Sequence, residues 1–118
     1  MKMRAVLFSL ALCPLAAFAD DAEIVAAEAD PSGDGYRFSV TLLHADTGWD
    51  DYADGWRVVL EDGTELGFRE LYHPHVNEQP FTRSLGSVVV PEGVTEVFIE
   101  ARTNTDGWGE ARLSVELP

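Results

Sequence analysis

The most constraining feature of this sequence is a regular alternation of apolar and polar residues. Every second residue from Tyr36 to Leu42 is apolar, and polar residues lie between them. The segments 97–102 and 111–117 alternate in the same way, although Phe98 interrupts the polar set of the first. Because successive side chains of a β-strand point to opposite faces, this period of two predicts strands with one face in a core.

Further strands are expected at residues 22–29, 56–60, 64–71 and 84–90, which brings the total to about seven. Asp62-Gly63 predicts a tight hairpin between the second and third of these, because such pairs accept positive φ angles. Seven short strands with regularly spaced turns predict a single all-β domain, an antiparallel β-sandwich of immunoglobulin or fibronectin type III style. The alternative is an α+β domain with a helix at Ala22–Ala29.

The alternation also predicts the core of this sandwich. Trp56, at the start of a strand, matches the buried tryptophan that is typical of such folds. The other expected core residues are Phe38, Val40, Leu42, Val58, Leu60, Val97, Ile99, Leu113 and Val115.

Residues 1–19 have the features of a cleaved secretory leader. A basic start, MKMR, precedes the apolar run AVLFSLALCPLAA, and the small residues AFA follow. The run is too short for a membrane span, so we expect cleavage after Ala19 and a periplasmic or secreted domain at residues 20–118. Lipid attachment at Cys13 is the rival, but Leu12 is large where a lipoprotein signal requires a small residue, and Pro14 follows the cysteine.

The expected mature chain is strongly acidic. Lys2 and Arg4 leave with the leader, and six arginines then face 21 acidic residues, a net charge of −15. The only cysteine leaves as well, so apolar burial without disulfides must stabilise the domain. Such a charge repels phosphates, which argues against nucleic acid and anionic lipid as partners.

Strand parity assigns the loops to the two ends of the sandwich. If successive strands are antiparallel, alternate connections fall at the same end. One end then carries the short turns Asp30–Gly35, Asp62–Gly63 and Pro91–Val94. The other end, called the loop end below, carries residues 44–55, 73–82 and 104–109, and every histidine of the chain lies there. Loops on a rigid scaffold commonly carry function, so the loop end is the expected binding site.

The histidines of the loop end predict a metal site. His73 and His75 share a face if their segment is extended, and His44 continues the inward line of its strand. With Glu78 and Asp46 these side chains would suit Cu²⁺ or Zn²⁺, which accept imidazole and carboxylate ligands. The competing interpretation is that the histidines bond to the backbone of a rigid loop.

Other interpretations of the loop end remain open. Asp46, Asp50, Asp51 and Asp54 offer oxygen ligands for Ca²⁺, although their spacing is not that of an EF-hand. The aromatic residues Trp49, Tyr52, Tyr72 and Trp108 could form a platform on which sugar rings stack, and a protein partner is the remaining class.

The segment before the expected strand at 84–90 favours a structural role. Glu78 and Arg83 are expected to form an ion pair that staples their loop, while Phe81 anchors it in the core. No enzyme is predicted, because the chain has no G-x-S-x-G elbow, no Gly-rich phosphate loop and no H-E-x-x-H motif.

Three segments together resemble a group of small secreted bacterial proteins with no established activity. They are HADTGWDDYADGWRV, HPHVNEQPFTRSL and VTEVFIEAR, and the HPHVxEQPFTRSL-like segment is the most specific. The resemblance covers nearly all of residues 20–118. It implies a small exported β-sandwich and carries no reaction or ligand with it.

Overall fold

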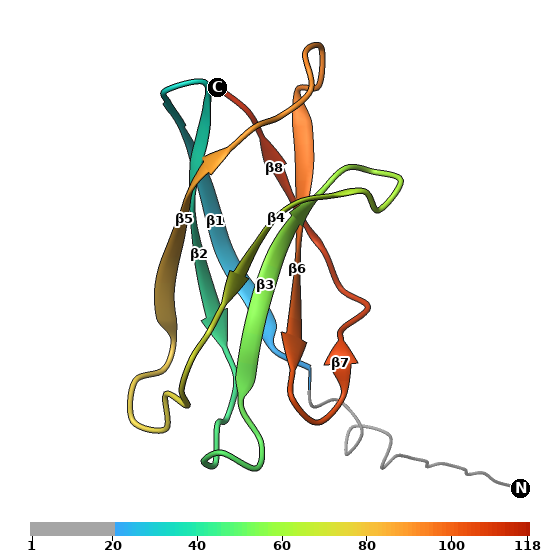
Figure 1. The fold of residues 1–118 in the computed structure, drawn as a ribbon. Helices are drawn as coiled ribbons and strands as arrows, with labels where there is room; N and C mark the ends of the chain where they lie inside the picture. Colours follow the sequence, from blue (N-terminus) through green and yellow to red (C-terminus); the bar gives the residue numbers. More distant parts are fainter. Residues whose placement is uncertain (1–20) are drawn as a thin grey trace, which may run out of the picture.

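The computed structural model describes residues 21–118, which form eight strands and no helix within that range (Figure 1). The predicted leader, its cleavage site after Ala19 and Cys13 lie outside the described residues. The strands are β1 (Glu23–Ser32), β2 (Gly35–Leu43), β3 (Ala53–Val59), β4 (Glu65–Glu70), β5 (Phe81–Val88), β6 (Glu96–Thr103), β7 (Gly107–Trp108) and β8 (Leu113–Glu116).

The strands form two antiparallel sheets, which confirms the predicted β-sandwich. The smaller sheet has the order β1-β2-β5, and the larger has β4-β3-β6-β7, with β8 also paired to β6. The two sheets face each other in Figure 1. Residues 23–29 belong to β1, which pairs with β2, so the alternative helix at Ala22–Ala29 is wrong. Pairing with a neighbouring strand overrides the helical propensity of its alanines and glutamates, as tertiary contacts commonly do.

The alternation that predicted the strands also identified most of the core. Of the nine predicted core residues, seven are buried, and Leu60 and Leu113 are partly buried against that core. Trp56 is fully buried, as expected. Phe81 also lies in the core, at 2% exposure, and holds the start of β5 there.

The outer face of the larger sheet has its own side-chain cluster. The Arg57 guanidinium lies 3.8 Å from the ring centre of Trp108 and forms an ion pair of 2.8 Å with Glu100. Phe68 packs edge-on against Trp108, with ring centres 5.9 Å apart. A cation over an indole face is favourable, so this cluster holds Trp108 on the sheet.

The connection between β3 and β4 is longer than the predicted two-residue hairpin. The strands pair up to Val59 and Glu65, so residues 60–64 form the loop. The Asp62 carboxylate accepts hydrogen bonds from the backbone N–H and the hydroxyl of Thr64, at 3.0 and 2.7 Å. Gly63 has a φ of 94°, as its position in the turn requires. Among residues 21–118 no helix is long and apolar enough to cross a membrane.

Candidate functional site

The loop end is organised around the buried carboxylate of Asp46. Its Oδ1 accepts hydrogen bonds from His44 Nδ1 at 2.7 Å and from the backbone N–H of Ala53 at 3.1 Å. Its Oδ2 accepts a bond of 2.8 Å from the backbone N–H of His75, 29 residues away in the chain. Asp46 therefore joins the β2–β3 loop, the start of β3 and the β4–β5 loop.

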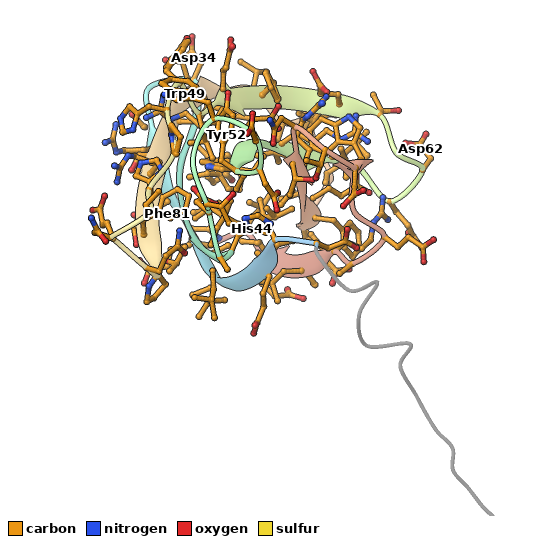
Figure 2. All side chains as sticks on the ribbon, turned by 90° about the horizontal axis from the view of Figure 1, so that it is seen from below. Asp34, His44, Trp49, Tyr52, Asp62 and Phe81 are labelled. Atoms are coloured by element: carbon orange, nitrogen blue, oxygen red, sulfur yellow. The ribbon has the colours of Figure 1, made fainter. Side chains whose placement is uncertain are left out.

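The amide of Gln79 makes a second link between these loops. Its Oε1 accepts a hydrogen bond of 2.9 Å from the backbone N–H of His44. Its Nε2 donates one of 3.1 Å to the backbone carbonyl of His75. Figure 2 looks onto this end, where His44, Trp49 and Tyr52 of the β2–β3 loop and Phe81 at the start of β5 are labelled.

The environment of His75 fixes its tautomer. The side chain is buried between the ring of Phe81, stacked with centres 4.0 Å apart, and the Arg83 guanidinium. Arg83 Nη2 lies 2.9 Å from His75 Nε2, and a guanidinium can only donate, so Nε2 must be the acceptor. The imidazole is then neutral, with its proton on Nδ1. No atom of residues 21–118 is a hydrogen-bond partner of this buried Nδ1.

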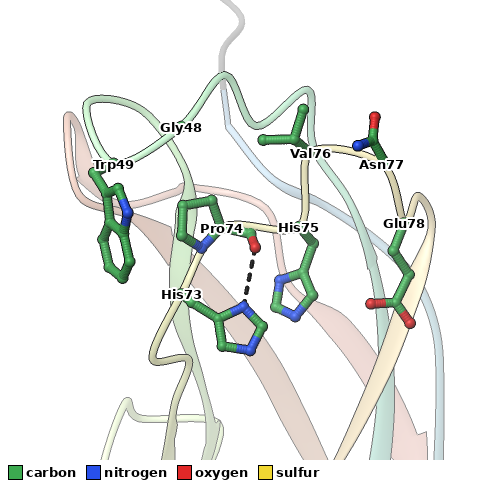
Figure 3. Close-up of a pocket in the computed structure, with 8 residues that line it drawn as sticks. All are labelled: Gly48, Trp49, His73, Pro74, His75, Val76, Asn77 and Glu78. Carbon is green, nitrogen blue, oxygen red and sulfur yellow. Dashed lines mark hydrogen bonds between the residues drawn. The ribbon is translucent and has the colours of Figure 1, made fainter.

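A pocket of about 480 Å³ opens beside this imidazole (Figure 3). Gly48 and Trp49 of the β2–β3 loop and residues 73–78 of the β4–β5 loop line it. Trp49 is 65% exposed, and its ring lies across the pocket from Glu78 in Figure 3. The volume falls within the range of small-molecule sites, roughly 300–1,000 Å³.

Some polar groups of the pocket already form hydrogen bonds or ion pairs within the protein. His73 Nδ1 lies 3.0 Å from the carbonyl of Pro74, which leaves Nε2 as its second polar atom. The Glu78 carboxylate, 59% exposed, forms the predicted ion pair with Arg83 at 3.3 Å. This exposed pair contributes little to stability, but it neutralises the charge of Glu78 beside the pocket.

The burial of His75 predicts how stability depends on pH. Burial, then the positive charges of Arg83 and His73, lower the pKa of His75. As the pH falls below about 6.5, the unfolded chain takes up a proton that the folded state resists, so stability present above that pH is lost. We expect the urea-unfolding free energy to fall from pH 7.5 to 5.5, and to fall less in His75→Gln. His73→Gln removes only the smallest of the three effects that lower the pKa of His75, so it should reduce the slope less than His75→Gln does. Equal slopes in wild type and His75→Gln would contradict the prediction.

The structure gives no support to the predicted metal site at His44, His73, His75, Glu78 and Asp46. Within residues 21–118, no group of three or more His, Cys, Asp or Glu side chains is arranged to hold a metal ion. The parity argument correctly placed the histidines at one end, but His44 turns its Nδ1 to Asp46 and is buried. His75 bonds to Arg83, and a guanidinium beside an imidazole opposes a bound cation.

The acidic loop gives no better support to a calcium site. Asp54 forms an ion pair with Arg102 at 2.9 Å, and Asp46 bonds to backbone N–H groups. Asp51 Oδ1 lies 3.4 Å from the hydroxyl of Thr105. Asp46 Oδ1 and Asp51 Oδ1 lie 2.7 and 3.7 Å from the two ring nitrogens of His44, so these carboxylates are used in contacts that hold the loop.

The predicted aromatic platform is reduced to one residue in the pocket. Trp49 lines the pocket, while Trp108 packs with Arg57 and Phe68 on the outer sheet face. Tyr72 is 68% exposed but does not line the pocket. Tyr52 supports Trp49 from the side, with ring centres 5.6 Å apart in an edge-on arrangement.

Two features of the site were not predicted from the sequence. The first is the role of Asp46 as a buried acceptor for two loops, and the second is the contact of Arg83 with His75. Asp at the start of a loop is a common backbone-capping residue, and that signal was available for Asp46. No local signal pointed to Arg83 and His75, since their contact depends on how the loop folds back.

Comparisons with known proteins identify a similar chain in Halomicrobium mukohataei, named "Putative lipoprotein". The two are 45% identical over 84 residues, which is 71% of this chain and 41% of the relative. This chain therefore corresponds to less than half of the length of that protein. No family model matches the chain. No solved structure matches it either.

Proposed function

We propose that this chain is an exported binding module, without catalytic activity, whose ligand site is the pocket between the β2–β3 and β4–β5 loops. Export is supported by the leader-like residues 1–19 and by the similarity to a chain named as a lipoprotein. The binding role rests on one arrangement in the pocket. Trp49, which is exposed, lines the same pocket as three exposed polar side chains, those of His73, Asn77 and Glu78.

This arrangement is characteristic of a ligand site for two reasons. The exposed polar groups of His73, Asn77 and Glu78 lie beside one another in the pocket, so a ligand can form several hydrogen bonds there. A tryptophan that is 65% exposed gains little from folding, whereas it offers a large stacking surface to a ligand. Asp46 and Gln79 hold the two loops together, so the pocket exists before a ligand arrives.

Chemical-shift mapping of the ¹⁵N-labelled domain tests the site without assuming a ligand. The probes are neutral tetrasaccharides, L-arginine, choline, tri-alanine and ZnCl₂, each at millimolar concentration. At least one class should shift the amide signals of residues 48–49 and 73–78 by more than those of residues 60–64 at the opposite end. Shifts that are equal at both ends for every probe would rule out the pocket as the binding site.

A further inference from the structure

We infer that the ligand of this pocket is a neutral carbohydrate, bound by stacking of a sugar ring on Trp49 and by hydrogen bonds to the β4–β5 loop. This inference rests on the proposed function and names the ligand class of the same site. Four observations carry it: the fixed position of Trp49, the mixture of donors and acceptors, the local charge, and the shape of the pocket wall.

The loop that carries Trp49 is held in place by hydrogen bonds. Thr47 N–H donates to the carbonyl of Asp51 at 3.0 Å, and Asp51 N–H donates to the carbonyl of Gly48 at 3.2 Å. The carbonyl of Trp49 itself accepts a bond of 2.9 Å from the side-chain amide of Asn104. The exposed indole, with Tyr52 against its edge, is therefore carried on an ordered backbone, and binding loses little backbone entropy there.

The polar wall opposite Trp49 offers both donors and acceptors. The Glu78 carboxylate is an acceptor, the amide of Asn77 can donate or accept, and His73 Nε2 is a further polar atom. A sugar hydroxyl both donates and accepts, so a ring with several hydroxyls satisfies such a set. A hydrocarbon ligand would remove water from these polar groups without replacing their hydrogen bonds.

The charge of the site selects a neutral sugar. Arg83 neutralises Glu78 at 3.3 Å, so the pocket has no unpaired carboxylate to attract a cation. At longer range the expected mature charge of −15 repels an anionic polysaccharide. A metal ion is disfavoured for the reason given above, since Arg83 bonds to the His75 ring nitrogen.

The apolar and polar sides of the pocket match the two sides of a pyranose. Trp49 forms one wall, and residues 73–78 form the other (Figure 3). A β-linked gluco- or xylo-configured ring has equatorial hydroxyls, so its C–H face can lie on the indole while its edge reaches the polar wall. Oligosaccharides of this configuration are therefore the expected probes.

Isothermal titration with cellotetraose and xylotetraose tests the inference. We expect saturable binding to at least one of them, and no binding of the β-1,4-linked glucuronate tetramer, which keeps the linkage and the equatorial hydroxyls of cellotetraose but has a carboxylate on every unit. Trp49→Ala should weaken binding at least tenfold. Tyr72→Ala, which removes an equally exposed aromatic side chain outside the pocket, should leave it within twofold.

The other outcomes separate the two proposals. Equal binding by wild type and Trp49→Ala, or tighter binding of the glucuronate tetramer than of cellotetraose, would overturn the inference of a neutral carbohydrate. If neither neutral sugar binds while L-arginine, choline, tri-alanine or ZnCl₂ shifts the pocket amides, the inference fails and the binding module stands. If no probe shifts these amides, both proposals fail. Far-UV circular dichroism shows whether each variant is folded.

Discussion

Asp46→Ala is expected to lower the free energy of unfolding by about 3–5 kcal/mol, the largest effect of any change at the loop end. The substitution leaves three buried donors without their acceptor: His44 Nδ1 and the backbone N–H groups of Ala53 and His75. Each unsatisfied buried donor costs about 1–3 kcal/mol, and water at the rim of the core reduces the total. Urea denaturation measures the change, and Tm should fall by more than about 12 °C.

Two further variants make this prediction specific. Asp50→Ala removes an exposed carboxylate from the same loop and should change stability by less than about 0.5 kcal/mol. Asp46→Asn keeps one oxygen acceptor and should fall between wild type and Asp46→Ala. If Asp46→Ala and Asp50→Ala cost the same, Asp46 does not hold the loops together.

Trp56→Ala is expected to destabilise the domain by about 3–5 kcal/mol through the cavity that it leaves between the sheets. Trp56 is fully buried and has the largest buried side chain of the described residues. Its indole Nε1 has no hydrogen-bond partner within residues 21–118, so the loss comes from packing alone. For the same reason Trp56→Phe should cost clearly less than Trp56→Ala in urea denaturation.

The exposed tryptophan provides the matched control for the buried one. Trp49→Ala removes the same type of side chain as Trp56→Ala, but one that is 65% exposed, and should change the free energy of unfolding by less than about 1 kcal/mol. A loss as large as that of Trp56→Ala would mean that Trp49 supports the fold, and its exposure would then need no ligand to explain it.

The fold could be predicted because residues close together in the sequence determine the strands and turns. The alternation around Phe38 and Val40 sets both the strand and its buried face, and short turns leave few ways to connect the strands. Strand parity then placed His44, His73 and His75 at one end. Which side chains meet there could not be predicted, because it depends on side-chain direction over a few ångströms. The Asp46 carboxylate points inward and accepts hydrogen bonds from backbone N–H groups, and the ring nitrogen of His75 that a metal would need is bonded to Arg83.

The position of Arg83 has a consequence for the open edge of the smaller sheet. Strand β5 is the last strand of that sheet, and Arg83 pairs with Val40, so it lies on the inward row of side chains. A second chain that added a strand at this edge would have to enclose a guanidinium on its apolar side, which is costly. One charged residue thus discourages edge-to-edge aggregation in an expected mature chain that has no disulfide to restrain its unfolding.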